Sequence, residues 1–155
     1  MTRDDFGQLY LQLLPGLYRL AQSILRQRED AMDAVHQAIE KAWKASGRMR
    51  PGGEKAYITR IVINECRNIQ RYRMRVVPRP EFPENEPERP DPELYEAVSR
   101  LPEKLRLPLL LRYMEGYSEK ETAEALHISP AALKSRLFRA RKRLKDIIIE
   151  EGQDL

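Results

Sequence analysis

A run of prolines in the middle of the chain constrains the fold more than any other feature. Residues 76–92, VVPRPEFPENEPERPDP, contain six prolines and five acidic residues. Each proline lacks a backbone N–H donor and has a fixed φ, so neither a packed helix nor a sheet can use so many of them. We therefore expect an extended acidic linker over residues 76–92, between two small domains formed by residues 1–75 and residues 93–155.

The composition favours helices on both sides of this linker. Charged residues make up 34% of the 155 residues, glycine occurs only 7 times, and runs of β-branched residues are few. These features are typical of an all-α protein. The net charge is only +4, but the basic residues are concentrated locally, and local patches matter more for nucleic-acid binding than the total charge.

Several classes of protein are disfavoured by what the sequence lacks. Its one cysteine, Cys66, cannot form an internal disulfide and suggests a reducing compartment. No apolar run approaches the roughly 20 residues of a membrane-spanning helix, and the first residues lack the apolar core of a signal peptide. His36 and His127 are far apart in the sequence, and no nucleophile or metal-ligand cluster is evident. We expect a cytoplasmic protein without direct membrane insertion, bound metal, cofactor or enzymatic activity.

The N-terminal domain shows helical periodicity almost throughout. Apolar residues recur every three or four positions and predict helical stretches over residues 4–14, 17–26, 30–45 and 54–74. Pro15 and Gly16 predict a break between the first two stretches, and Asp30 is a good N-cap for the third. Residues 46–53, SGRMRPGG, are expected to form a flexible basic loop because they hold three glycines and a proline. Arginines interleaved with a tyrosine in residues 67–75 suit a nucleic-acid surface.

The C-terminal domain contains a predicted helix-turn-helix in residues 117–145. Ser118 and Glu121 form the S-x-x-E pattern of a capping box, which starts a short helix. After a turn at residues 127–129, Ser129 can cap a second helix that has Pro130 in its first position. Residues 134–145 include seven basic residues and no acidic one, so this second helix suits the major groove of DNA. With expected helices over residues 93–100 and about 102–114, the domain becomes a four-helix unit.

Three segments in this order resemble bacterial RNA polymerase sigma factors of the extracytoplasmic-function class, in the sigma-70 family. Residues 101–145 follow the family's region-four pattern almost throughout. DAMDAVHQAIEKAW, residues 30–43, resembles the family's D-A-x-D-x-x-Q-x-x-x-x-x-x-W segment, and residues 56–73 resemble a segment of region two. Tyr57, Asn68 and His127 stand where the family usually has Trp, Asp and often Gly. The resemblance implies promoter recognition and initiation of transcription.

The resemblance also implies partners and contact residues. The partners are core RNA polymerase, through its β′ clamp helices and β flap, promoter DNA and an anti-sigma factor. The expected polymerase contacts, taken to be exposed, are Asp30, Asp33, Gln37, Glu40 and Lys41. The expected contacts to the −10 element are Arg48, Arg50, Arg60, Asn64, Arg67, Asn68 and Arg71. The expected contacts to the −35 element are Ala131, Ala132, Lys134, Ser135, Arg136, Arg139 and Arg143.

Asn64 has a second interpretation. It lies near the apolar side of its predicted helix, where it would need either a buried hydrogen bond or a DNA contact, and we favour a contribution to the geometry of the preceding loop. Two alternative functions also remain open at this point. One is a helix-turn-helix regulator that binds an operator without polymerase. The other is a sigma-like protein that binds polymerase but has lost promoter recognition.

Overall fold

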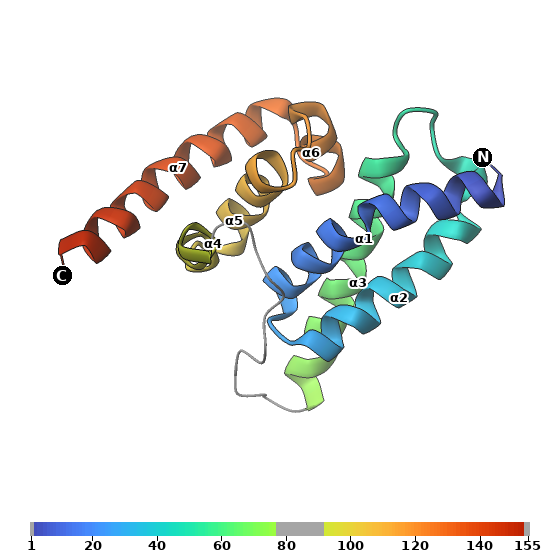
Figure 1. The fold of residues 1–155 in the computed structure, drawn as a ribbon, viewed down its shortest axis with the longest axis horizontal. Helices are drawn as coiled ribbons and strands as arrows, with labels where there is room; N and C mark the ends of the chain where they lie inside the picture. The colour runs from blue at the N-terminus through green and yellow to red at the C-terminus, as the bar shows by residue number, and fades with distance from the viewer. Residues whose placement is uncertain (1, 77–91, 154–155) are drawn as a thin grey trace. The chain divides into compact units, whose positions relative to one another are not determined.

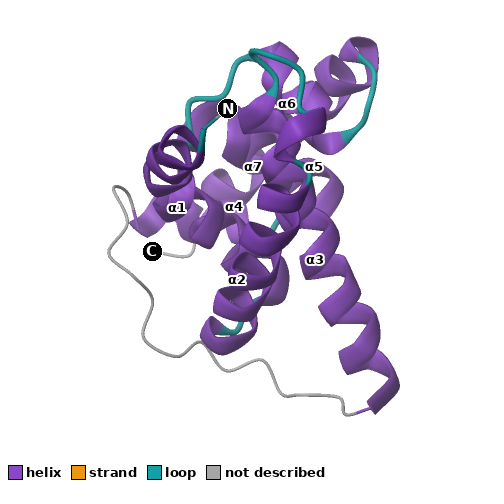
Figure 2. Ribbon diagram, turned by 90° about the vertical axis from the view of Figure 1, so that its right-hand side faces the viewer, coloured by secondary structure: helices purple, strands orange, loops and turns teal. Residues whose placement is uncertain are grey.

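The computed structural model describes residues 2–76 and 92–153, and these residues form helices without any strand (Figures 1 and 2). Apart from its two end residues, the predicted linker lies outside the described residues. The chain forms two compact units, divided after Glu86, and we call them the N-terminal and the C-terminal unit. The elements in chain order are α1 (Arg3–Leu25), α2 (Arg28–Lys44), η1 (Ser46–Arg48), α3 (Glu54–Val76), α4 (Pro92–Ser99), α5 (Glu103–Leu109), η2 (Leu110–Met114), α6 (Glu119–Leu126) and α7 (Pro130–Gln153).

The N-terminal unit is a bundle in which each of the three long helices packs against the other two. Leu17 and Leu20 of α1 and Ile58 and Val62 of α3 are fully buried. The buried side of α2 consists mainly of alanines, which provide little side-chain volume. The core is therefore filled chiefly from α1 and α3, while α2 packs through small side chains.

Pro15 lies inside α1, so the predicted break at this position is wrong. Proline removes the N–H that would otherwise bond the carbonyl of Leu11, one turn earlier. Both Leu11 and Pro15 are on the exposed side of α1, where water can satisfy that carbonyl. Tyr10, Leu17 and Leu20 are buried on the other side and hold the two halves in one helix. Burial of the opposite face thus outweighs the local cost of the proline.

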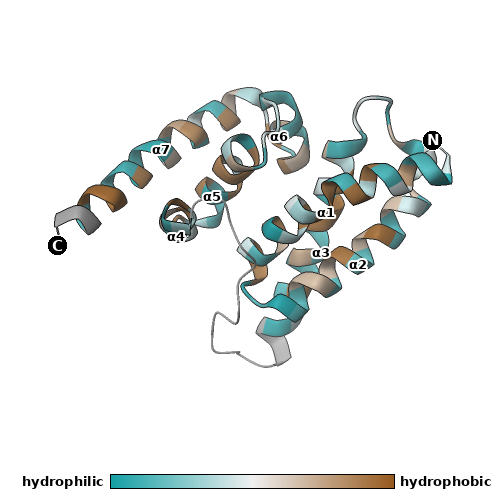
Figure 3. Cartoon of the chain, in the orientation of Figure 1, coloured by the Kyte–Doolittle hydropathy of each residue, from teal (hydrophilic) through white to brown (hydrophobic). Residues whose placement is uncertain are grey.

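The C-terminal unit has a core rich in leucine. Val98, Leu101, Leu109, Leu133 and Leu137 form one buried cluster that joins α4, α5 and α7. Along α7, apolar and hydrophilic stretches alternate in Figure 3, as expected for a helix with one packed face. The leucine periodicity of the sequence therefore identified the packed side of this unit correctly.

The predicted helix over about residues 102–114 changes its hydrogen bonding part of the way along. Its first part is α5, which contains the buried Pro108, and its second part is the π-helix η2. The amide of Glu115 donates to the carbonyl of Leu110, five residues earlier, at 2.9 Å. Gly116 follows with a φ of 73°, in the left-handed conformation with which a glycine commonly ends a helix. None of the described helices has the length and apolar character needed to cross a membrane.

Candidate nucleic-acid interface

The helix-turn-helix forms as its sequence predicts. Ser118 Oγ accepts from the amide of Glu121 at 3.0 Å, and Glu121 Oε1 accepts from the amide of Ser118 at 2.9 Å, so both bonds of the capping box are made. His127 ends α6 in the left-handed region, with φ 57° and ψ 47°. Ser129 Oγ then accepts from the amide of Ala132 at 3.1 Å, and Pro130 is the first residue of α7. Local hydrogen bonds thus fix the direction in which α7 leaves the turn.

The packing of α7 determines which of its side chains can reach DNA. Leu133, Leu137 and Ala140 are buried in the core. Of the seven residues expected at the −35 element, Ala132 and Arg136 are half-buried and the others are exposed, namely Ala131, Lys134, Ser135, Arg139 and Arg143. Arg139 Nη2 donates to Ser135 Oγ at 3.1 Å, so these two side chains lie together on the outer face. The structure brings the set together on the sides of α7 that face away from the leucines.

Phe138 is an exposed residue on α7 that the sequence reasoning missed. It is 65% exposed, although its neighbour Leu137 is buried. A signal was present, because position 138 does not belong to the apolar stripe that runs through Leu133, Leu137, Ala140 and Leu144. A single exposed apolar side chain does not by itself mark a contact surface, so Phe138 is an accessible residue of α7 without an assigned role.

Arg141 of α7 has a partner within the C-terminal unit. Its guanidinium lies 5.8 Å from the ring centroid of the exposed Tyr113, and it donates a hydrogen bond to the Tyr113 hydroxyl. Arg112 lies 5.6 Å from the same centroid. The contact of Arg141 joins η2 to the middle of α7, whereas Arg112 and Tyr113 are neighbours within η2.

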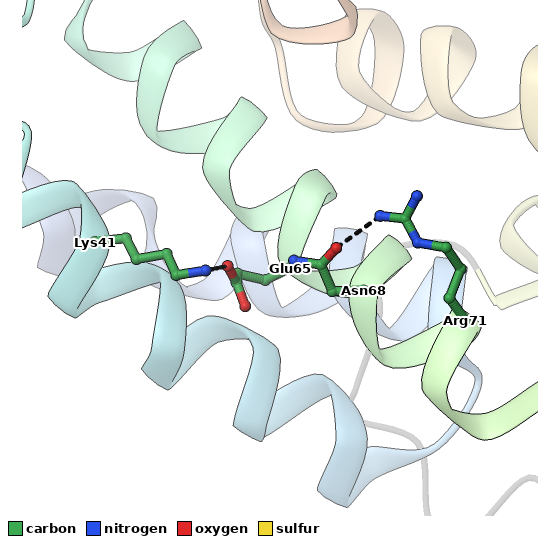
Figure 4. A network of polar contacts seen from close by, with 4 residues as sticks. All are labelled: Lys41, Glu65, Asn68 and Arg71. Carbon is green, nitrogen blue, oxygen red and sulfur yellow. Dashed lines mark hydrogen bonds and ion pairs between the residues drawn. The ribbon is translucent and has the colours of Figure 1, made fainter. Parts of the chain in front are cut away.

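In the N-terminal unit, α3 carries the second candidate surface. Asn64, Arg67, Asn68 and Arg71 are exposed, and their spacing of three and four residues places them along one side of the helix. Asn68 Oδ1 accepts from Arg71 Nη2 at 2.6 Å (Figure 4). Asn64 is exposed, so its predicted place near the apolar side of α3 is wrong, and of the two alternatives stated for it a buried hydrogen bond is not required.

The other expected −10 contacts lie before and at the start of α3. Arg48 is in η1 and Arg50 follows it, and both are exposed, whereas Arg60 is half-buried in α3. Gly52, with a φ of 84°, turns the loop and donates its amide to Glu54 Oε2 at 3.0 Å. The basic loop therefore leads directly into the exposed side of α3.

Two of the five residues expected on the polymerase-binding side of α2, Asp30 and Lys41, are ion-paired with α3, and Asp30 is also buried, which contradicts the predicted exposure of this residue. Asp33, Gln37 and Glu40 are exposed. Asp30 is buried and ion-paired with Arg73 of α3, because its position in the first turn of α2 faces the end of that helix. It is also not the N-cap, since Gln27 precedes α2.

Lys41 is exposed, but its ammonium group is ion-paired with the buried Glu65 of α3. Glu65 lies on the buried side of α3, and the sequence reasoning did not identify its partner. A signal was available, because a carboxylate on an apolar stripe requires a cation from a neighbouring helix.

The described residues contain no group of three or more His, Cys, Asp and Glu side chains that could hold a metal ion. The ionisable side chains of the two surfaces are dominated by arginine and lysine, which attract phosphate. Both surfaces therefore have the basic character that suits a nucleic-acid backbone.

Comparisons with known proteins agree with this geometry. The chain matches the family described as Sigma-70 region 2 over residues 9–76 and the family described as Sigma-70, region 4 over residues 92–144. It is 31% identical over 154 residues to the ECF RNA polymerase sigma factor SigM of Mycobacterium tuberculosis, covering 94% of this chain and 78% of SigM. It is 28% identical over 141 residues to the RNA polymerase sigma factor SigV of Bacillus subtilis, covering 86% and 85%.

The fold is also similar to a solved structure. The sigma factor RpoE of Bartonella quintana, in complex with the anti-sigma factor NepR, superposes with a TM-score of 0.74 at 26% identity, covering 93% of this chain and 96% of RpoE. The region 2 match lies in the N-terminal unit and the region 4 match lies in the C-terminal unit. The similarity to SigM extends over nearly the whole chain. The chain therefore belongs to the extracytoplasmic-function RNA polymerase sigma factors of the sigma-70 family.

Proposed function

We propose that this sigma factor holds a promoter at two places, with α7 at the −35 element and with α3 and the preceding loop at the −10 element. The observation that carries the proposal is the face of α7 that points away from the leucine core. The capped turn fixes the direction of this helix, and its basic residues stand on the free sides. A helix presented in this way fits the major groove.

The N-terminal half of α7 supplies the contacts that read bases. Ala131 and Ala132 are small and allow a close approach of the helix to the groove. Arg136 and Arg139 have guanidinium groups that can bond a guanine with two hydrogen bonds, while Lys134 and Ser135 suit a base edge or a phosphate. Arg143, two turns further on than Arg136, serves as a phosphate contact.

The N-terminal unit supplies the −10 contacts through Arg48, Arg50, Arg60, Asn64, Arg67, Asn68 and Arg71. The arginines neutralise phosphates, and the amides of Asn64 and Asn68 can bond an unstacked base of the non-template strand. Unstacking a base costs a few kcal/mol, which contacts to the extruded base must offset. The pairing of Asn68 with Arg71 holds both side chains ready on the same side of α3.

Core polymerase is the partner of α2, whose exposed side carries Asp33, Gln37 and Glu40. We assign the β′ clamp helices to this side and the β flap to the C-terminal unit. We place the domains at residues 1–75 and 93–155, with residues 76–92 as the linker; the end of α3 at Val76 and the start of α4 at Pro92, each one residue inside the proposed linker, support this division. An anti-sigma factor is a further partner, supported by the complex of RpoE with NepR.

The protein acts in the cytoplasm as an initiation factor and not as an enzyme.

The proposal is tested by mixing the protein with core polymerase and measuring initiation from a genomic promoter library. We expect initiation at a defined set of promoters that share −10 and −35 elements. Absence of initiation, together with tight binding of the free protein to an operator as a dimer, would contradict the proposal and favour a helix-turn-helix regulator.

A further inference from the structure

The contact between α2 and α3 is unusual in its chemistry. The buried residues of α2 are Asp30, one valine and four alanines. An alanine ends in a single methyl group, so it allows two helices to approach closely but interdigitates little with its neighbours. The fit of large side chains normally selects one well-ordered packing, and this contact has few of them. Another feature must therefore fix the register of the two helices, that is, the position of α2 along the axis of α3.

Two ion pairs connect the helices at separate points along this contact. Asp30 pairs with Arg73. Lys41 pairs with Glu65, and Figure 4 shows this second pair. The two residues of α2 are eleven positions apart, which is close to three full turns and places them on the same side. The earlier residue of α2 pairs with the later residue of α3, as required for antiparallel helices.

The acidic partner of each pair is in the interior. The side chains of Asp30 and Glu65 are only 7% and 4% exposed, whereas Arg73 and Lys41 are 31% and 57% exposed. A buried carboxylate without a cation is strongly unfavourable. A shift of α2 along α3 by one turn would deprive both carboxylates of their partners, so the pairs favour a single register.

Rather than acting as free contacts, Asp30 and Lys41 connect the two functional surfaces. On α2 they lie before and after the exposed Asp33, Gln37 and Glu40. On α3, Glu65 points toward Lys41 of α2, while Asn68 and Arg71 lie further along the helix and the Arg71 side chain extends away from α2 (Figure 4). The register of the two helices thus determines where the −10 surface lies relative to the polymerase-binding side.

We propose that the Asp30–Arg73 and Lys41–Glu65 ion pairs lock this register, and that Asp30 and Glu65 are positioning residues for promoter opening. The inference rests on the proposed function of α2 and α3. With the lock intact, a polymerase bound to α2 presents α3 at the correct place for the strand that must be separated. Without it, the protein still binds polymerase and promoter, but it opens the −10 region less often.

The test uses the full chain with core polymerase. Glu65→Gln and Lys41→Met each remove one charge of the Lys41–Glu65 pair, whereas Lys41→Arg retains the pair. Lys44→Met is the matched control at an exposed lysine of the same helix. Three quantities are measured for each variant: the Kd for core polymerase, the permanganate reactivity of −10 thymines at saturating protein, and the melting temperature. All promoter measurements are made well below the lowest melting temperature.

We expect Glu65→Gln to lower the opened fraction about tenfold at saturation, with a Kd for polymerase within about twofold of the wild type. Lys41→Met gives a similar loss, and the double variant is no worse than either single one, because residues that act as a pair are not additive. Lys41→Arg and Lys44→Met open promoters normally. A template with a preformed −10 bubble restores initiation by Glu65→Gln.

Two results would overturn the register lock. One is normal opening by Glu65→Gln and Lys41→Met with only a lower melting temperature, which is the result of a purely structural role. The other is a raised Kd for polymerase in Lys41→Met alone, which is the result of a direct polymerase contact. If Glu65→Gln does not fold, comparison of Lys41→Met with Lys41→Arg decides between these results. Failure of the proposed function is distinct, because the wild-type chain itself would then open no promoter.

Discussion

The two units present similar basic surfaces on very different supports. In the C-terminal unit, α7 rests on leucines, and a capped turn determines its direction. In the N-terminal unit, α3 rests partly on an alanine-rich helix and is tied to it by two ion pairs with buried carboxylates. On α7 the charged residues beside the leucine stripe lie at the surface, whereas on α2 Asp30, which lies beside the alanine stripe, belongs to the interior.

Loss of a core leucine should have the largest effect on the free energy of unfolding, and it should show whether the two units unfold independently. Leu133→Ala removes a buried side chain of the C-terminal unit and should lower its free energy of unfolding by about 2–5 kcal/mol. The only tryptophan, Trp43, packs edge-on against Phe6 in the N-terminal unit, so its fluorescence reports on that unit alone. Urea unfolding should show an earlier transition by circular dichroism and an unchanged one by Trp43 fluorescence.

The control for this variant is Leu11→Ala, at an exposed leucine of α1, which should change the stability of the N-terminal unit by less than about 0.5 kcal/mol. If Leu133→Ala moves the Trp43 transition as far as the circular dichroism transition, the two units do not have separate cores.

Removal of the buried carboxylate of Asp30 should have the next largest effect on the free energy of unfolding. Asp30→Ala leaves Arg73 without its partner, but Arg73 is partly exposed, so water can solvate it. We expect a loss of about 1–3 kcal/mol, which lies below the cost of breaking a fully buried pair. The Trp43 transition in urea measures this loss. Glu96→Ala, at the exposed Glu96–Arg100 pair of α4, should cost roughly 0–0.5 kcal/mol. Equal costs at the two pairs would contradict the distinction between an interior and a surface pair.

Tyr10 makes the N-terminal unit sensitive to alkaline pH. Its hydroxyl donates to the carbonyl of Val35 at 2.8 Å, and burial raises the pKa of Tyr10 to about 12. In the unfolded chain tyrosine loses its proton at about pH 10, so the stabilisation is fully present below pH 10 and is lost as the pH rises through 12. At pH 11 the loss should be about 1.4 kcal/mol.

The alkaline loss is measured as the difference between the Trp43 urea transitions at pH 9 and pH 11. Tyr10→Phe lacks the ionisable hydroxyl and should remove this part of the difference. An alkaline loss of the same size in Tyr10→Phe would assign the effect to other groups.

The smallest expected effect is a gain of stability in the turn of the helix-turn-helix. His127 occupies the left-handed region, where a β-carbon is strained and glycine is not. His127→Gly should therefore stabilise the C-terminal unit by about 0.5–1 kcal/mol, partly offset by the greater entropy of the unfolded chain. The circular dichroism transition should move to higher urea while the Trp43 transition stays in place. A loss of stability would mean that the His127 side chain makes a contact that outweighs the strain.

The C-terminal unit could be predicted from the sequence almost completely. Ser118, Ser129, Pro130 and Gly116 are local signals, and each acts through a hydrogen bond or a backbone angle within a few residues of itself. The switch from α5 to the π-helix η2 was not predictable, because it depends on how the buried Pro108 and the following leucines fit the surrounding helices.

The N-terminal unit was predicted less well for a physical reason. The continuity of α1 through Pro15 depends on packing by helices that are distant in the sequence. The pairing of Asp30 with Arg73 and of Lys41 with Glu65 spans 43 and 24 residues. Periodicity identifies the buried side of a helix, but it does not show which cation reaches a carboxylate from another helix. Hence Asp33, Gln37 and Glu40 remain exposed candidates for polymerase contacts. The other two expected contacts, Asp30 and Lys41, form ion pairs with α3.

The measurement that tests the central claim most directly is transcription by reconstituted polymerase from promoters in which each −10 and −35 base pair is substituted in turn. The account predicts that Arg136→Ala reduces discrimination at one −35 position by about 1–3 kcal/mol and leaves the −10 profile intact. Asn68→Ala should change the −10 profile alone. An equal loss of transcription from every promoter with both variants would contradict recognition of the −35 element by α7 and of the −10 element by α3.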